Sequence, residues 1–128
     1  MVKKEFWSYA DYESLIHELV KKLRNDKRMK YIRNVYGIPR GGLPIAVHLS
    51  HFLNLNFLTN PFDKMHEETL IVDDIADTGK TLKKCGSLYL TATLFYKPRS
   101  EIKPDFYIYE TTKWIVFPWE TSYEIPNR

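Results

Sequence analysis

Two acidic residues near the middle of the chain are followed by a short run of hydroxyl and glycine residues. Leu70-Ile71-Val72 is an apolar run typical of a buried strand, and Asp73 and Asp74 come directly after it. Adjacent carboxylates repel each other, and the pKa of one rises unless a cation or hydroxyl donors share them. Because strand side chains alternate, we expect the two acids to point in different directions. Together they predict a site for Mg²⁺ and a sugar diol.

The run Thr78-Gly79-Lys80-Thr81 continues this segment as a turn that enters a short helix. Free backbone N–H groups at a helix start, together with two threonine hydroxyls, suit a phosphate monoester. Gly79 permits the close backbone approach and the unusual φ that such a loop needs. The run is not a Walker A loop, because Asp74 occupies the position where that loop has its first glycine.

A second anion site is predicted where Arg40-Gly41-Gly42 follows the strand candidate 31–36. Two glycines after an arginine let a loop turn tightly while its amides and guanidinium face one anion. An arginine followed by two glycines is, by itself, more often a surface turn. The tripeptide alone does not decide between these interpretations.

The elements that position these residues follow from hydrophobic spacing and turn signals. Ser8 predicts a helix start with Asp11 in an imperfect capping box, followed by one apolar stripe: Tyr12, Leu15, Ile16, Leu19, Val20 and Leu23. Further helices are predicted over 44–52 and from Gly79 to about Cys85, the second ended by Gly86 and Ser87. The remaining ranges are strands over 31–36, 54–58, 69–72, 89–96 and 106–109, a polar connection over 59–68, and a closing strand or loop over 114–119.

Strands that alternate with helices predict an α/β fold, with a central parallel sheet flanked by helices and a small C-terminal hood. A chain of 128 residues fits one domain, which we expect to span 1–128. Ligands of such sheets bind beyond the carboxyl ends of the strands. Both predicted anion sites fall there.

Composition narrows the class of protein. An apolar fraction of 44% suits a packed globular protein, and 19 basic against 16 acidic residues is too mild an excess for a nucleic-acid-binding protein. Cys85 is the single cysteine, no apolar run reaches membrane-spanning length, and no signal-peptide pattern begins the sequence. We therefore expect a cytoplasmic protein without a membrane or nucleic-acid partner. His48, His51 and His66 lack partners at ligand spacing, so a histidine metal site is not expected.

The segment 70–81 closely resembles the phosphoribosyl pyrophosphate signature of type I phosphoribosyltransferases, in which a hydrophobic strand and two acids precede a four-residue phosphate loop. The segment 36–42 resembles the pyrophosphate loop of that family. Family members often have a non-proline cis peptide directly before the arginine of this loop, and Pro39–Arg40 is the corresponding bond. The resemblance implies that Mg²⁺ and phosphoribosyl pyrophosphate are ligands of this chain.

The resemblance also implies a role for each residue of these segments. Asp73 and Asp74 would engage the ribose hydroxyls, directly or through Mg²⁺. The pyrophosphate would be held by Arg40, Gly41 and Gly42, and the 5′-phosphate by Thr78, Gly79, Lys80 and Thr81. Asp77 would contact the purine N7 and manage its proton.

Two C-terminal segments resemble the base-recognition parts of bacterial xanthine–guanine phosphoribosyltransferases. Lys97 stands before a proline, as does the family lysine that donates to the 6-oxo group of the purine. Trp114 matches the aromatic residue that stacks on the base, and Ile115 matches the residue whose backbone contacts the base edge. A lysine donor favours a 6-oxo over a 6-amino purine, and an indole offers a large stacking surface. Without the other motifs, Trp114 would be more typical of a core or an interface.

The resemblance runs from Trp7 to Glu120 and implies an enzyme of nucleotide salvage. Such an enzyme transfers the phosphoribosyl group from phosphoribosyl pyrophosphate to guanine, xanthine or hypoxanthine and releases pyrophosphate. It also implies a homodimer or a homotetramer.

One departure from the family pattern leaves alternatives open. Family members close a long mobile loop over the reacting centre, whereas here the shorter segment 59–68 would serve and lacks the Ser-Tyr-rich lid sequence. A shorter lid would leave the centre wetter and favour hydrolysis or slow turnover. A non-catalytic sensor that binds a nucleotide or phosphoribosyl pyrophosphate in the same pocket is therefore one alternative. A phosphatase or phosphotransfer domain built on the acidic strand end is another.

Overall fold

The computed structural model describes residues 3–85 and 88–120, which form a five-stranded parallel sheet and a two-stranded parallel sheet. The larger sheet has the order β3-β2-β4-β5-β6, and β1 pairs with β7 in the smaller one. The strands are β1 (Lys4–Phe6), β2 (Asn34–Gly37), β3 (Asn56–Leu58), β4 (Thr69–Ala76), β5 (Leu90–Tyr96), β6 (Tyr109–Glu110) and β7 (Trp114–Val116). The helices are α1 (Tyr9–Arg24), α2 (Gly42–Phe52) and α3 (Lys80–Cys85), with 3-10 helices at Lys27–Tyr31, Pro61–Asp63 and His66–Glu68.

Helix α1 begins and packs as its sequence predicts. The hydroxyl of Ser8 accepts a hydrogen bond from the N–H of Asp11 (3.1 Å), and the carboxylate of Asp11 accepts one from the N–H of Ser8 (2.9 Å). The capping box is therefore complete although an aspartate replaces the usual glutamate. The buried residues of the helix are those of the predicted apolar stripe: Tyr12, Leu15, Ile16, Leu19, Val20 and Leu23.

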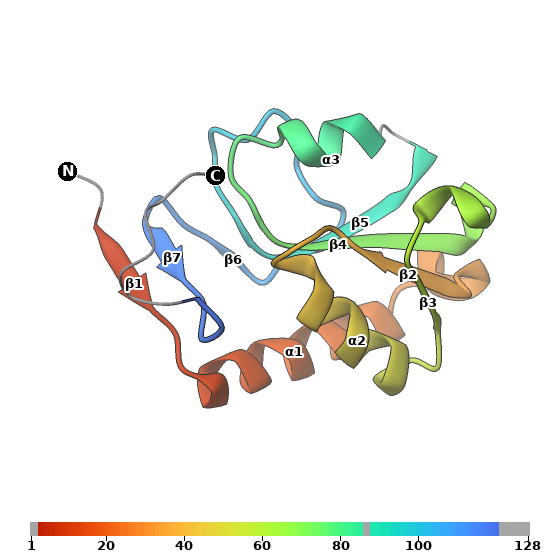
Figure 1. Cartoon of the computed structure of the whole chain (residues 1–128), viewed down its shortest axis with the longest axis horizontal. Helices are drawn as coiled ribbons and strands as arrows, with labels where there is room; N and C mark the ends of the chain where they lie inside the picture. Colours follow the sequence, from red (N-terminus) through yellow and green to blue (C-terminus); the bar gives the residue numbers. More distant parts are fainter. Residues whose placement is uncertain (1–2, 86–87, 121–128) are drawn as a thin grey trace.

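The helices form layers on both faces of the larger sheet. Figure 1 shows α1 and α2 below the sheet and α3 above it. The larger apolar cluster joins α1 and α2 to the sheet, whereas the smaller one lies beneath α3 and contains Ile38, Ile71, Ala76 and Leu82. The predicted fold class, a central parallel sheet flanked by helices, is confirmed.

Strand β4 is twice as long as predicted and carries both acids within it rather than after it. It spans Thr69–Ala76, but β2 pairs with it only as far as Val72. Beyond that point β4 pairs with β5 alone, from Asp73↔Thr93 to Ala76↔Tyr96. The acids therefore lie where one neighbouring strand has ended, and the edge of β4 is open to the loop before α2.

Two other elements differ from the sequence prediction. Residues 27–31 form a 3-10 helix, in which the carboxylate of Asp26 accepts a hydrogen bond from the N–H of Arg28 (2.8 Å), so β2 begins only at Asn34. The strand predicted over 106–109 is reduced to a bridge between Ala92 and Phe106 and to the short β6. The predicted helix end at 86–87 lies outside the described residues.

The predicted hood is built from both ends of the chain. Strand β7 lies within the predicted closing segment, but its partner is the N-terminal strand β1, in the register Glu5↔Ile115. The N–H of Trp7 also donates to the carbonyl of Val116 (3.0 Å). Strand β1 was not predictable from the sequence, because three residues are too few to show strand alternation.

Candidate active site

The acids of β4 point to different sides of the strand. Asp74 is buried, and a Cβ placed on Gly41 would overlap its carboxylate, so Asp74 faces the loop before α2. Asp73 faces α3, where burial and the nearby charge of Asp73 raise the pKa of the Cys85 thiol. The N–H of Asp74 donates to Asp73 Oδ1 (2.9 Å), and the N–H of Ile75 donates to Asp74 Oδ1 (2.8 Å). The expected difference in direction is present.

Glycines allow the loop 37–42 to lie directly on β4. A Cβ on Gly42 would lie 2.5 Å from the carbonyl oxygen of Val72 and 3.2 Å from the Cα of Asp73. The peptide bond Pro39–Arg40 is cis, as the resemblance predicted. Arg40 is exposed and directly precedes Gly41, whose backbone lies against the carboxylate of Asp74. Two of the predicted pyrophosphate residues, Gly41 and Gly42, therefore lie against β4 at the acids, and Arg40 adjoins them in the chain.

The predicted phosphate loop leaves β4 and turns directly into α3. Gly79 has φ +81°, and a Cβ there would lie 2.7 Å from the backbone nitrogen of Glu101. The N–H of Glu101 donates to the carbonyl of Thr78 (2.7 Å), and the N–H of Lys80 donates to the hydroxyl of Thr78 (3.4 Å). The loop after β5 thus supports the backbone of the phosphate loop, and only a glycine fits at this contact.

Asp77 is a buried carboxylate that meets two cations through the same oxygen. Its Oδ1 lies 3.5 Å from Lys97 Nζ, 2.9 Å from Arg99 Nε and 2.5 Å from Arg99 Nη2. Its Oδ2 is buried and has no hydrogen-bond partner among the described residues. A buried charged oxygen without a donor is costly, so Oδ2 is a place where a ligand N–H would be stabilising.

The predicted base-binding residues Lys97 and Trp114 lie together beside Asp77. The ammonium of Lys97 is buried and lies 5.5 Å from the centre of the Trp114 ring, a cation–π distance. The N–H of Lys97 donates to the carbonyl of Ala76 (2.9 Å), which holds it beside the end of β4. The side chain of Ile115 is fully buried in the larger core, so only its backbone is available to a ligand.

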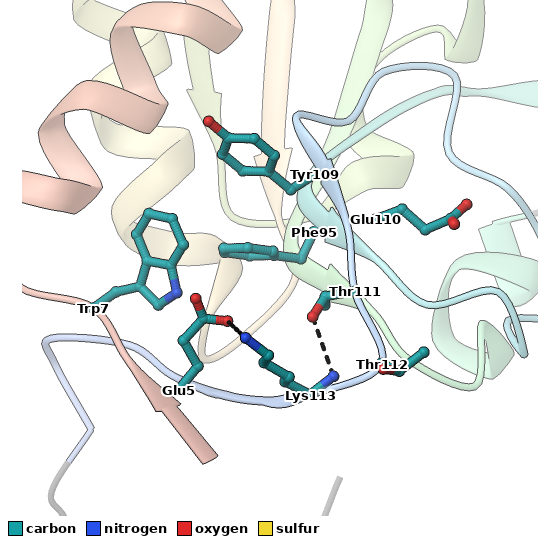
Figure 2. Close-up of a pocket in the computed structure, with 8 residues that line it drawn as sticks. All are labelled: Glu5, Trp7, Phe95, Tyr109, Glu110, Thr111, Thr112 and Lys113. Carbon is teal, nitrogen blue, oxygen red and sulfur yellow. Dashed lines mark hydrogen bonds and ion pairs between the residues drawn. The ribbon is translucent and has the colours of Figure 1, made fainter. Parts of the chain in front are cut away.

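A separate pocket of about 510 Å³ lies beside the hood and contains none of the predicted site residues. Figure 2 shows the aromatic rings of Trp7, Phe95 and Tyr109 on one side, and the ion pair between Lys113 and Glu5 (3.7 Å) across the opening. Lys113 directly precedes the predicted stacking residue Trp114. The pocket therefore borders the base-binding segment without being part of it.

Sequence reasoning missed Arg99, whose guanidinium completes the Asp77 cluster. The signal in the sequence is its position two residues after Lys97, across Pro98, in the turn that follows a strand. In this turn the N–H of Ser100 donates to the carbonyl of Lys97 (2.9 Å), which brings residue 99 back over the end of β4.

Comparison with known proteins identifies the family of this chain. Residues 59–126 match the model of the phosphoribosyl transferase domain, which is more than half of the chain. The chain belongs to this family. The xanthine-guanine phosphoribosyltransferase of Cereibacter sphaeroides is 32% identical over 117 residues, which cover 70% of each protein. The predicted similarity to xanthine–guanine phosphoribosyltransferases is thereby confirmed.

Solved structures show the same relationship for this phosphoribosyltransferase. The purine phosphoribosyltransferase of Pyrococcus horikoshii superposes with a TM-score of 0.79 at 30% identity, covering 97% of this chain and 99% of that one. The xanthine-guanine-hypoxanthine phosphoribosyltransferase of Helicobacter pylori, at 22% identity, has the same fold, with a TM-score of 0.78 and 93% of each chain covered.

Among the described residues, no helix is both long and apolar enough to cross a bilayer.

The connection 59–68 was expected to serve as the lid of this phosphoribosyltransferase. It precedes β4 and lies at the amino ends of the parallel strands, opposite to the predicted site. Figure 1 shows it in yellow-green beside the start of β4, whereas the phosphate loop follows the other end of that strand and the acids lie within its second half. The hydroxyl of Tyr89, just before β5, donates to the carbonyl of Pro61 (3.5 Å), and the hydroxyl of Thr69 donates to the carbonyl of Met65 (2.9 Å). These contacts hold the connection away from the predicted reacting centre.

Proposed function

We propose that this purine phosphoribosyltransferase transfers the phosphoribosyl group from phosphoribosyl pyrophosphate to a 6-oxopurine and releases pyrophosphate, as a cytoplasmic enzyme of nucleotide salvage. The observation that carries the proposal is the cluster of Lys97, Trp114 and Asp77 next to the phosphate loop. A cationic donor, a flat aromatic surface and a carboxylate oxygen without a donor are the groups that a 6-oxopurine would use.

The donor would lie across the open edge of β4. The 5′-phosphate would accept hydrogen bonds from Thr78, Gly79, Lys80 and Thr81, and the pyrophosphate would be held by Arg40 and by the amides of Gly41 and Gly42. Asp73 and Asp74 would accept hydrogen bonds from the ribose hydroxyls. The support for this arrangement is that the loop 37–42 lies against β4 at Val72 and the acids while the phosphate loop follows the end of the same strand, so one extended ligand can reach both.

Mg²⁺ fits the chemistry of the acidic pair. Mg²⁺ prefers oxygen ligands and is commonly bound through one or two carboxylates plus substrate phosphates rather than by a full protein cage. Among the described residues, no group of three or more histidine, cysteine or acidic side chains is placed to hold an ion by itself. Asp73 and Asp74 would therefore share Mg²⁺ with the donor, and the ion would neutralise charge on the leaving pyrophosphate.

The reaction breaks the bond from ribose C1 to the pyrophosphate oxygen and forms a bond from C1 to a ring nitrogen of the purine. Trp114 and Lys97 would orient the base, the first by stacking and the second by donating to the 6-oxo group, while the backbone of Ile115 would contact the base edge. Asp77 Oδ2 would accept the N–H at N7 and manage its proton as the new bond forms. These residues would hold a weak nucleophile in line with C1.

A four-base assay tests the proposed function. The protein is incubated with phosphoribosyl pyrophosphate, Mg²⁺ and guanine, xanthine, hypoxanthine or adenine, and nucleotide and pyrophosphate are both quantified. We expect nucleotide with at least one 6-oxopurine, and a loss of about 10²-fold or more in Asp77→Asn. Protein that binds the donor but forms no nucleotide with any base would contradict the proposal.

The position of the connection 59–68 favours one second candidate, a non-catalytic sensor. A reacting centre without this lid is open to water, and a binding protein has no need to exclude water. A sensor would bind a purine nucleotide or phosphoribosyl pyrophosphate tightly and release no pyrophosphate with any base. Release of pyrophosphate without a base would instead indicate an active centre in which water competes with the purine.

A further inference from the structure

The carboxylate of Asp77 is oriented by a residue to which no role has been assigned. An arginine commonly binds a carboxylate through two parallel hydrogen bonds, one to each oxygen. Here Nε and Nη2 of Arg99 both donate to Oδ1, at 2.9 and 2.5 Å, and Lys97 Nζ lies on the same oxygen at 3.5 Å. The second oxygen, Oδ2, is left buried without a described partner.

This asymmetry fixes which oxygen faces a ligand. Two cations on one side of the carboxylate oppose its rotation about the Cβ–Cγ bond, because rotation would break three contacts at once. A neutral side chain at position 99 would leave Lys97 as the only cation on Oδ1. Lys97 would then be drawn toward the carboxylate and away from its position over the ring of Trp114.

The side chain of Arg99 lies at the surface and is not part of the hydrophobic core. Its side chain is 62% exposed, whereas that of Asp77 is 8% exposed. The guanidinium lies at the surface and Lys97 stays on Oδ1 when it is removed, so Asp77 keeps a cationic partner and the fold should be retained. The turn that carries Arg99 supports the phosphate loop through the backbone hydrogen bond from Glu101 to Thr78 (2.7 Å), and a substitution of the Arg99 side chain leaves that bond in place.

We propose that Arg99 is a positioning residue that holds Asp77 with Oδ2 turned toward the purine N–H and keeps Lys97 free for the 6-oxo group. The inference rests on the proposed function, because it assigns Arg99 to positioning Asp77 and Lys97 to binding the 6-oxo group of the purine. It predicts that Arg99 affects the base half of the ligand and not the phosphoribosyl half.

The test compares Arg99→Gln and Arg99→Lys with the control Lys103→Gln, which removes an exposed cation near the rings of Tyr96 and Tyr107. For Arg99→Gln we expect kcat/KM for the base to fall by about 10- to 100-fold, because misplacing a reacting group by about 1 Å costs that much. The KM for phosphoribosyl pyrophosphate should change by less than about twofold. Arg99→Lys should recover part of the loss, because an ammonium can reach Oδ1 as a single donor.

A double-mutant cycle separates positioning from a general structural effect. In the Asp77→Asn background, Arg99→Gln should cause almost no further loss, since the two residues act through one carboxylate. Additive losses, or a loss of donor affinity equal to the loss for the base, would overturn the proposal. Unchanged kcat/KM in Arg99→Gln alongside an active wild type would overturn it while leaving the proposed function intact.

If the wild-type protein forms no nucleotide, a binding measurement tests the role of Arg99 instead. Calorimetry with guanosine 5′-monophosphate and with ribose 5-phosphate compares a ligand that has a base with one that lacks it. The proposal expects Arg99→Gln to weaken the first by about tenfold and to leave the second unchanged. Equal effects on both ligands, or no effect on either, would overturn it, and thermal unfolding of each variant verifies that the fold is retained.

Discussion

The side chain of Lys97 is buried, so its ammonium group needs partners within the protein. It is buried at the end of β5, with the carboxylate of Asp77 on one side and the face of Trp114 on the other. Burying an ammonium without such partners would be costly, so the position favours a lysine that also serves a ligand. The proposed selection of 6-oxopurines depends on this residue more than on any other.

Replacing Lys97 should remove the preference for an oxo group. Lys97→Met keeps most of the volume and the aliphatic stem but has no donor for the base. Because a hydrogen bond from a charged donor contributes about 1.5–3 kcal/mol, kcat/KM for guanine or hypoxanthine should fall by about 10- to 150-fold. Steady-state kinetics with each base measure this effect, with Lys103→Met as the matched control. A variant that keeps wild-type selectivity would contradict the assigned role.

The pKa of the Cys85 thiol depends on the charge of Asp73. Burial raises the pKa of its thiol most, and the negative charge of Asp73 raises it further. Since the thiolate is the reactive form, Cys85 should alkylate more slowly at pH 8 than a free cysteine. Asp73→Asn removes one of the two causes, so the pKa should fall and the alkylation rate should rise. Iodoacetamide kinetics from pH 7 to 10 check this, and an unchanged pH profile would show that Asp73 does not act on Cys85.

At the scale of elements, the site depends on how closely the start of α2 approaches β4. The approach is possible because Gly41 and Gly42 have no side chains where the loop meets the strand. The two glycines meet different partners, the side-chain carboxylate of Asp74 for Gly41 and the strand backbone for Gly42. Substitutions at these neighbouring positions should therefore have different consequences.

Gly42→Ala should destabilise the fold, whereas Gly41→Ala should mainly impair the site. The new Cβ at position 42 would lie 2.5 Å from the carbonyl oxygen of Val72, which cannot move without shifting β4. Such overpacking costs about 1–3 kcal/mol of the free energy of unfolding, measurable by urea denaturation. At position 41 the new Cβ would displace the side chain of Asp74 rather than the backbone of β4, so binding of Mg²⁺ and the donor should weaken more than stability. Equal losses of stability in both variants would contradict this distinction.

At the scale of the whole molecule, exposed apolar side chains occur on α2 and on β3, the edge strand that packs beside it. Leu43 and Val47 are 37% and 42% exposed on α2, and Phe57 is 41% exposed on β3. Strand β3 is the edge of the larger sheet, and it packs beside α2. Apolar groups gathered at one edge are typical of a surface that another protein covers.

We propose that this surface contributes to a homodimer or a homotetramer. Val47→Glu places a charge on the exposed face of α2 without touching the core, so it should shift the protein toward the monomer. Sedimentation velocity over a range of concentrations measures the change, with His51→Glu on the same helix as the control. A wild-type protein that remains a monomer at high micromolar concentration would contradict the proposal.

The fold was predictable where the signal is local and periodic. The stripe of α1 and the capping residue Ser8 predict that helix, and the apolar run before the acids predicts the first half of β4. The length of β4 was not predictable, because Asp73 and Asp74 are disfavoured in strands and are tolerated here only beside the open edge. Strand β1 was not predictable either, since it exists only through its pairing with β7.

The candidate site was predictable for residues inside a continuous motif. The cluster of Lys97, Trp114 and Asp77 joins segments that are far apart in sequence. Only the resemblance to purine enzymes predicted from the sequence that these residues share one site. Arg99 was missed because its position two residues after Lys97 in a turn does not distinguish a site residue from an ordinary surface arginine. The position of the connection 59–68 depends on contacts with Thr69 and Tyr89 that its own sequence does not indicate.

A competition experiment tests the central claim most directly. Equal concentrations of guanine, xanthine, hypoxanthine and adenine are mixed with limiting phosphoribosyl pyrophosphate, Mg²⁺ and the protein, and the nucleotides formed are identified by mass spectrometry. We expect nucleotides of the 6-oxopurines, almost no adenosine 5′-monophosphate, and only trace product from Asp77→Asn. Adenosine 5′-monophosphate as the main product, or no nucleotide from protein that binds the donor, would contradict the account.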